Sequence, residues 1–138
     1  MSTVDDLHGD PHVQRYLDTG GAEGYHWNGT EILILFTTGR KSQEERRHAL
    51  IFREWNGSYL VVASKGGAEA PPEWFLNLEA DPHAEVQIKD RRFPVTARVA
   101  DDQEKPAMWS AMTQVWPAYD DYQAKSSRTI PVVVLDPS

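Results

Sequence analysis

The 138-residue chain has a formal net charge of −7, and hydrophobic residues make up 40% of it and charged residues 25%. This length and composition predict a single globular domain over residues 1–138 with one hydrophobic core. The acidic balance argues against broad electrostatic capture of a nucleic acid. The absence of cysteine excludes disulfides, thiolate metal sites and cysteine nucleophiles.

The sequence contains no recognisable signal for secretion. Residues 1–10 are polar and acidic, without the apolar stretch of a signal peptide, and we expect them to form a mobile N-terminus. The longest apolar runs, 32–36 and 130–135, are too short to cross a bilayer. We therefore expect a cytoplasmic protein without a transmembrane segment, and peripheral contact with the inner face of the membrane stays open.

Turn signals that contain glycine divide the first half of the chain. Gly20-Gly21 ends a short helical pattern that begins at a proline, and Asn28-Gly29 and Asn56-Gly57 are typical of tight turns between strands. The runs between these turns are rich in β-branched and aromatic residues, as strands are. The predicted elements, in chain order, are a helix at 11–18, a buried strand at 32–37, a polar, basic loop at 38–47, and a hairpin that pairs 49–52 with 59–63.

The second half alternates short helices with strands. Pro71-Pro72 opens a helix that Asp81-Pro82 ends, and Asp101 with Glu104 has the spacing of a capping box before another helix. The predicted elements are a helix with Trp74, Phe75 and Leu78 on one face, a hairpin of 84–88 with 93–99, a helix with the stripe Met108, Ala111, Met112, Val115 and Trp116, a helical piece after Pro117, and a strand at 130–135. About six antiparallel strands with short helices around them predict a mainly β (α+β) fold, a small barrel with helices over its openings.

Two loops in this acidic chain concentrate cations beside glycine. Residues 37–42 are Thr-Thr-Gly-Arg-Lys-Ser, and Arg46 and Arg47 follow closely. Residues 63–68 are Ala-Ser-Lys-Gly-Gly-Ala, which end a strand with a hydroxyl, a cation and a backbone open to close approach. The first loop can hold a phosphate or a carboxylate, and in the second the backbone amides can approach a ligand closely. Taken alone, the alternative for the first loop is a solvated hairpin turn, and for the second a plain Gly-Gly turn.

Aromatic residues recur every three positions in the predicted helical piece near the C-terminus. Trp116, Tyr119 and Tyr122 would form a flat, apolar wall with polar tips, which suits a planar ring system. Packing of these rings in the core is the alternative. For Trp74 and Trp109, packing in the core is the interpretation that we favour from the sequence alone.

Five ordered motifs lie between residues 37 and 134, within a resemblance that extends from about residue 20 to residue 137. They are T-T-G-R-K-S, V-V-A-S-K-G-G-A, P-x-W-[FY]-L-N-L-x-A-x-P, W-P-x-Y-x-x-Y-Q and R-x-I-P-V-V-V. Together they closely resemble the deazaflavin-dependent nitroreductase family, the actinobacterial quinone and nitro-compound reductases. The resemblance implies a split β-barrel (FMN-binding-like) and coenzyme F420, a deazaflavin with a phosphate and a polyglutamate tail. It also implies hydride transfer from the reduced coenzyme to a quinone, a nitro compound or a similar flat apolar acceptor.

The same resemblance implies roles for individual residues. Those expected at the phosphate and the tail carboxylates are Arg40, Lys41, Arg46 and Lys65; at the ring, Ala63 and Ser64; and at the acceptor, Trp74, Trp116, Tyr119 and Tyr122. Gly66 is also expected to bind the cofactor. The expected catalytic residues are Ser64, Tyr119 and Tyr122, with one tyrosine supplying a proton. The chain departs from the family pattern at Gln43 and Glu44, which occupy a turn that usually contains glycine, at Ala49, where relatives have proline, and at Trp116, where some have tyrosine.

Two other functions stay open on the sequence alone. One is an FMN- or haem-binding split-barrel protein, and the other is a protein that binds the deazaflavin without catalysis. The expected partners are a small-molecule electron acceptor and no nucleic acid, and the assembly is a monomer or a homodimer. His8 and His12 have a spacing that suits a metal, but no third ligand is near them, and we predict no metal site.

Overall fold

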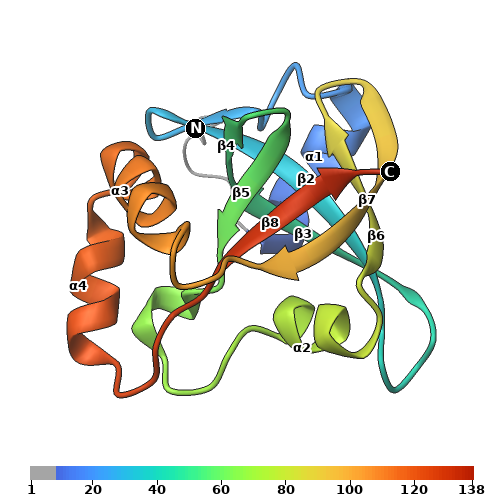
Figure 1. Cartoon of the computed structure of the whole chain (residues 1–138). Helices are drawn as coiled ribbons and strands as arrows, with labels where there is room; N and C mark the ends of the chain where they lie inside the picture. Colours follow the sequence, from blue (N-terminus) through green and yellow to red (C-terminus); the bar gives the residue numbers. More distant parts are fainter. Residues whose placement is uncertain (1–8) are drawn as a thin grey trace.

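The computed structural model describes residues 9–138, and it shows a curled antiparallel sheet with helices around its rim (Figure 1). The helices are α1 (Gly9–Thr19), α2 (Glu73–Ala80), α3 (Lys105–Val115) and α4 (Ala118–Lys125), with a short 3₁₀ turn, η2 (Lys65–Gly67). The strands are β1 (His26–Trp27), β2 (Thr30–Thr38), β3 (Glu45–Ile51), β4 (Arg53–Trp55), β5 (Ser58–Val62), β6 (His83–Ile88), β7 (Arg91–Val99) and β8 (Val132–Pro137). The mainly β fold is as predicted, with eight strands in place of about six.

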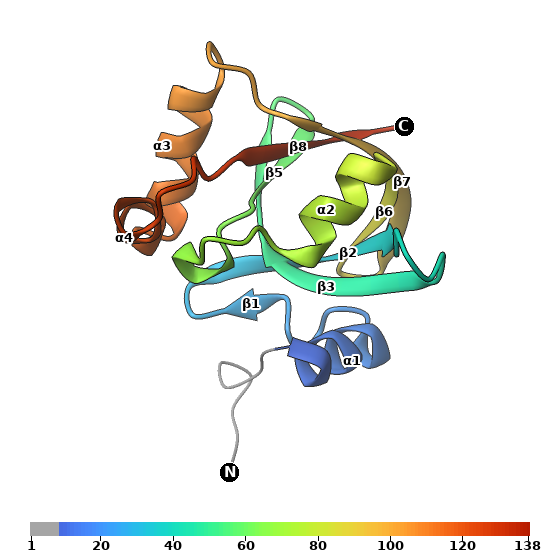
Figure 2. The same ribbon diagram turned by 90° about the horizontal axis from the view of Figure 1, so that it is seen from below.

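The strand β2 organises the sheet. The strand order is β1-β2-β6-β7-β8-β5-β4, and β3 pairs with β2 outside that path, so that β2 has three partners. Residues 32–37 of β2 are buried, as the sequence predicts for this apolar run. Helix α1 packs against β3 and α2 contacts β2, and Figure 2 shows α1 and α2 on opposite sides of β3.

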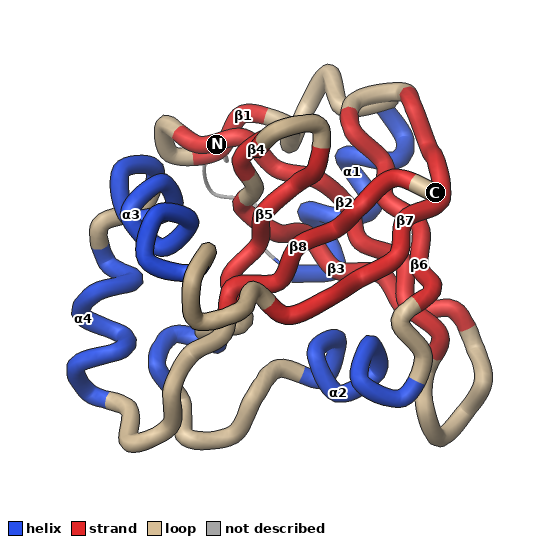
Figure 3. Tube along the Cα trace, in the orientation of Figure 1, coloured by secondary structure: helices blue, strands red, loops and turns tan. Residues whose placement is uncertain are grey.

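The core consists of two clusters. The larger one joins β2 to α1 and α2, and Tyr16, Leu33 and Trp74 belong to it. The smaller one lies where α3 and α4 meet β5 and β8, and it contains Met112 and Tyr119. In Figure 3 these two helices lie together at one end of the sheet, apart from α1 and α2. The apolar stripe predicted for α3 is confirmed at Met108, Ala111 and Met112, which are buried.

The predicted hairpin of 49–52 with 59–63 is wrong in its pairing. Residues 49–51 end β3, which pairs with β2 so that Ala49 lies opposite Ile34, whereas β5 turns at Asn56-Gly57 onto β4. The strand β3 begins at Glu45, so Arg46 and Arg47 belong to a strand and not to the predicted loop. The side chains at 45–47 are charged and exposed, and such a run lacks the apolar alternation that marks a strand in a sequence.

Two of the sequence predictions concern the starts of helices, those of α1 and α3. The predicted mobile N-terminus, residues 1–10, lies outside the described part of the chain except for Gly9 and Asp10, which begin α1. The predicted capping box is present, because Asp101 Oδ1 accepts from the Glu104 N–H at 2.8 Å and Glu104 Oε2 accepts from the Asp101 N–H at 2.9 Å. No helix in residues 9–138 is long and apolar enough to cross a membrane.

Candidate functional site

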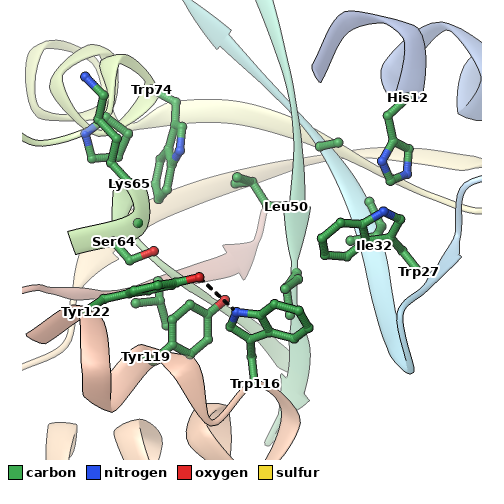
Figure 4. A pocket seen from close by; sticks show the side chains of 15 residues that line it. His12, Trp27, Ile32, Leu50, Ser64, Lys65, Trp74, Trp116, Tyr119 and Tyr122 are labelled. Atoms are coloured by element: carbon green, nitrogen blue, oxygen red, sulfur yellow. Dashed lines mark hydrogen bonds between the residues drawn. The ribbon is translucent and has the colours of Figure 1, made fainter. Parts of the chain in front are cut away.

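A cavity of about 420 Å³ lies between the open edge of the barrel and α4 (Figure 4). Its lining comes from segments far apart in the sequence, between His12 of α1 and Tyr122 of α4. The lining residues are His12, Trp27, Ile32, Ala49, Leu50, Ile51, Val62, Ser64, Lys65, Gly66, Pro72, Trp74, Trp116, Tyr119 and Tyr122. All four predicted acceptor residues belong to this set. Trp74 is also part of the larger core cluster, so the two interpretations of this residue hold together.

One wall of the cavity consists of aromatic rings from the end of α3 and from α4. The Trp116 indole N–H donates to the Tyr122 hydroxyl at 3.4 Å, and the Tyr119 and Tyr122 rings meet edge to face at 6.1 Å. Tyr119 is 5% exposed, and its hydroxyl has no hydrogen-bond partner within residues 9–138. Burial, with a smaller effect of Tyr122, holds the pKa of Tyr119 well above its usual value. The Tyr119 hydroxyl therefore stays protonated near neutral pH and can donate to a bound molecule.

Next to this wall the cavity is lined by Trp27 and His12, which the sequence analysis did not assign to it. The Trp27 ring lies 5.6 Å from the Trp116 ring, so residues from both ends of the chain meet there. His12 is 3% exposed, and its Nε2 lies 2.7 Å from the Gly24 carbonyl oxygen, which requires a proton on that nitrogen. Gly24 has a φ of +99°, and a Cβ there would lie 3.1 Å from the His12 ring.

The histidine contacts argue for a structural role of His12. Its Nε2 is used in the hydrogen bond to Gly24, and His8, four residues before it, lies outside the described residues. Within residues 9–138 no group of three or more histidine, aspartate or glutamate side chains could hold a metal ion. Trp27 could be recognised in the sequence only as an aromatic residue close to a buried strand, which is a weak signal.

The loop at residues 63–68 reaches the cavity through Ser64, Lys65 and Gly66. Lys65 and Gly66 both have left-handed backbone conformations, with φ of +46° and +63°. Ser64 is 8% exposed. Ala63 is fully buried and does not line the cavity; its N–H donates to the Pro131 carbonyl and its own carbonyl accepts from Arg128. Both main-chain groups of Ala63 thus have partners inside the protein.

A second hollow, of about 320 Å³, contains the other predicted cations, and we call it the cationic pocket. It is lined by Gly39, Arg40, Lys41, Ser42, Arg46, His48, Glu73 and Asn77. The two hollows adjoin along β3 and the start of α2. Side chains alternate along a strand, so Arg46, His48 and Leu50 share one face of β3; the first two line the cationic pocket and Leu50 lines the cavity.

Buried hydrogen bonds fix the position of Arg40. Asn77, which is 4% exposed, accepts from the Arg40 main-chain N–H at 3.2 Å and from its Nη1 at 3.0 Å. The Asn77 amide donates to Thr37 Oγ1 at 3.1 Å. The Arg40 guanidinium also pairs with Glu73 at 2.7 Å. Asn77 and Glu73 are therefore functional candidates that the sequence analysis used only as part of a motif.

Cations of both loops, 37–42 and 63–68, act on Glu73. A hydrogen bond to Arg40 and its charge lower the pKa of Glu73, and the charges of Lys41 and Lys65 lower it further. Of the predicted phosphate-binding cations only Arg40 has a carboxylate partner; Lys41, Arg46 and Lys65 form no ion pair within the described part of the chain. These three cations are available to an anionic ligand.

His48 lies beside these cations as a neutral side chain. Burial and then the charge of Arg46 lower the pKa of His48 to about 4. Its Nε2 lies 3.4 Å from Thr37 Oγ1, at the end of the chain of hydrogen bonds that leads to Arg40 through Asn77. At neutral pH His48 adds no positive charge to the pocket.

Known proteins with similar sequences and folds identify the family of this chain. Residues 10–137 match the family described as F420H(2)-dependent quinone reductase. A relative of the same description from Mycobacterium tuberculosis is 37% identical over 128 residues, which are 90% of this chain and 86% of the relative. A solved F420-H2 dependent reductase, FDR-A, is 39% identical with a TM-score of 0.70 and covers 76% of this chain and 93% of its own.

A further solved structure, described as a domain-swapped dimer, is 37% identical, has a TM-score of 0.74 and covers 89% of this chain and 92% of its own. The haem storage protein HutZ of Vibrio cholerae has a TM-score of 0.60 at 14% identity, which shows a shared fold and no more. The predicted split β-barrel is thereby confirmed. The family match over residues 10–137 and the identity to the mycobacterial relative show that this chain belongs to the F420H2-dependent quinone reductase family.

Proposed function

We propose that this chain is an oxidoreductase that uses reduced coenzyme F420 to reduce a quinone, a nitro compound or a similar flat apolar acceptor. One observation carries the proposal beyond family membership: an aromatic-walled cavity adjoins a cationic pocket along β3 and α2. A ligand with a flat ring at one end and several anionic groups at the other matches both hollows. The cavity is also within the size range of small-molecule sites, about 300–1,000 Å³.

The residues present fit such a cofactor. Lys41, Arg46 and Lys65 have no carboxylate partner among residues 9–138, and an anionic phosphate or glutamate tail would supply one. Arg40 is held in place by Glu73 and Asn77, so we assign it a smaller share of the binding. We assign the ring to the cavity, beside the loop that carries Ser64 and Gly66.

The chemistry divides between the cofactor and the protein. Reduced coenzyme F420, when bound, supplies the hydride. The protein orients the two reactants and excludes water, and the rings of Trp116, Tyr119 and Tyr122 do this by closing one wall of the cavity. Tyr119 holds a proton on a hydroxyl that no protein group within the described residues engages, and the Tyr122 hydroxyl accepts from the Trp116 indole N–H. Either phenol can deliver a proton to an acceptor oxygen, and Ser64 can hydrogen-bond beside it.

The first experiment is a titration of the purified protein with oxidised coenzyme F420, FMN and haem in parallel. We expect the deazaflavin to bind most tightly, because FMN has a phosphate but no glutamate tail, and we expect added salt to weaken binding. Lys41→Ala and Arg46→Ala should each weaken coenzyme F420 by about tenfold, the effect of one charge-assisted contact, and should affect FMN less. Menadione should then reoxidise the reduced coenzyme catalytically.

Arg47→Ala is the matched control for Arg46→Ala. Arg47 is the next residue of β3, pairs with Glu45 at 3.8 Å and does not line the cationic pocket, so its loss should leave the affinity unchanged. FMN or haem binding as tightly as coenzyme F420 would favour another split-barrel function. Tight binding of the deazaflavin without turnover on any acceptor would leave a non-catalytic binder.

For the assembly we propose a homodimer, because a solved structure 37% identical to this chain is described as a domain-swapped dimer. Light scattering on the purified protein distinguishes this from a monomer. The cytoplasmic location and the contact with the inner face of the membrane stay predictions from the sequence.

A further inference from the structure

Arg128, the first residue of the motif R-x-I-P-V-V-V, donates hydrogen bonds to three main-chain carbonyls of the 63–68 loop. Its Nε donates to the Ala68 carbonyl at 2.8 Å, and its Nη2 donates to the carbonyls of Ala63 and Ser64 at 3.0 and 2.9 Å. The side chain is half-buried and has no carboxylate in ion-pair contact within residues 9–138. Its role in the structure is therefore to hold this loop.

These contacts fix the direction of two peptide groups, and the Gly67 N–H also donates to the Ser64 carbonyl, at 2.9 Å. In a trans peptide the carbonyl of one residue and the N–H of the next point in opposite directions, and the protein has no cis peptide in its described part. Because the carbonyls of Ala63 and Ser64 point at Arg128, the N–H groups of Ser64 and Lys65 point away from it. Neither N–H has a hydrogen-bond partner among the described residues, and both residues line the cavity whereas Arg128 does not.

The segment that carries Arg128 is itself tied to α4, which supplies the aromatic wall. Gln123 donates to the Arg128 carbonyl at 2.8 Å and accepts from the Ile130 N–H at 2.8 Å. The loop also abuts α4 directly, because a Cβ on Gly67 would lie 2.8 Å from the Tyr122 carbonyl oxygen. Arg128 thus connects the loop at the expected ring position to the helix at the expected acceptor position.

We propose that Arg128 is a positioning residue of the cofactor site, which turns the N–H groups of Ser64 and Lys65 toward the carbonyl oxygens of the pyrimidinedione part of a bound deazaflavin ring. This inference rests on the proposed function and adds to it a residue that touches neither cofactor nor acceptor. Loss of Arg128 should therefore affect binding of the ring and not of the tail. The cations Lys41 and Arg46 serve the phosphate and the tail.

Two probes separate the ends of the ligand: oxidised coenzyme F420, and the same deazaflavin ring without the phosphate and the glutamate tail. Fluorescence titration measures the affinity for each. We expect Arg128→Ala to weaken both probes by the same factor, about thirtyfold, as expected for loss of two aligned neutral hydrogen bonds. Lys41→Ala should weaken only the full coenzyme. Added guanidine, at a non-denaturing concentration, should restore the affinity of Arg128→Ala.

Arg53→Ala is the matched control for a purely structural effect. Arg53 donates to the Ala111 carbonyl and to Gln114 Oε1, both at 2.9 Å, and so joins β4 to α3 outside both hollows. Arg53→Ala should lower the melting temperature without changing the affinity for coenzyme F420 or for the tail-less ring. If Arg128→Ala does not fold, Arg128→Lys takes its place, because an ammonium lacks the planar fork that reaches several carbonyls.

The outcomes are distinct. Equal loss of affinity for both probes, with rescue by guanidine, supports the proposal. Wild-type affinity of a folded Arg128→Ala or Arg128→Lys for the tail-less ring overturns it, and so does a loss confined to the full coenzyme. If the wild-type protein binds neither probe, the proposed function itself has failed.

Discussion

Replacement of Asn77 tests how the cationic pocket is built. Asn77→Leu keeps a similar volume but removes the acceptor of the Arg40 main-chain N–H and guanidinium and the donor to Thr37. With Asn77 4% exposed, water cannot readily replace these contacts. Each neutral hydrogen bond contributes about 1 kcal/mol and one to a charged group about 1.5–3 kcal/mol. Because Arg40 keeps Glu73 and partial access to water, we expect a loss of about 2–4 kcal/mol in unfolding free energy.

Urea denaturation measures this loss, provided that the slope of the transition stays constant between variants. Asn77→Asp should cost less than Asn77→Leu, since a carboxylate still accepts from Arg40 and the Thr37 hydroxyl can rotate to donate to it. Gln14→Ala, which removes an exposed hydrogen bond of 2.8 Å to Asp18, is the control and should change stability by less than about 0.5 kcal/mol. A cost below about 1 kcal/mol for Asn77→Leu would show that Arg40 and Thr37 find other partners, and the argument would fail.

Two further predictions concern the tyrosines and His48. Tyr119→Phe removes a hydroxyl without a partner among residues 9–138, so the stability of the protein should hardly change. If that phenol supplies the proton, kcat for a quinone should fall. A wild-type kcat in both Tyr119→Phe and Tyr122→Phe would limit the two rings to stacking. Unfolded His48, with the usual pKa of 6.5, takes up a proton as pH falls toward 4, whereas the folded protein, with a pKa of about 4, does not. The native state should therefore lose stability over this range, and His48→Gln should flatten the profile of denaturation midpoint against pH; an unchanged profile would contradict the assignment.

Elements with strong local signals were predictable from the sequence. The apolar run of β2, the proline-opened α2 and the stripe of α3 each identify their own burial, because hydrophobic periodicity is a local property. The ordered motifs also identified Trp116, Tyr119 and Tyr122, which line the cavity together.

Features that depend on pairing were not predictable. The strand β3 begins with exposed charged residues and takes β2 as its partner, although Asn56-Gly57 marks a hairpin just beyond it. Trp27 lies in a strand of two residues and reaches the cavity only because β1 folds back on β2. Asn77 belongs to a recognised motif, but its hydrogen bonds to Arg40 join residues 37 positions apart, and no spacing rule identifies such a contact.

The pairing of β3 with β2 has a consequence for how the length of the intervening loop can vary. Arg46, opposite Thr37, and Leu50, opposite Leu33, share one face of β3, and they carry the cationic pocket and the cavity respectively. A one-residue shift of β3 would turn Arg46, His48 and Leu50 to the other face. The cationic pocket would then lose Arg46 and His48, whereas the cavity is lined from both faces of β3, because Ala49 and Ile51 line it beside Leu50. An insertion in the 39–44 loop that changes the register of β3 against β2 therefore keeps Arg46 in the cationic pocket only if it contains an even number of residues. An insertion that leaves the register unchanged and bulges outward can have any length.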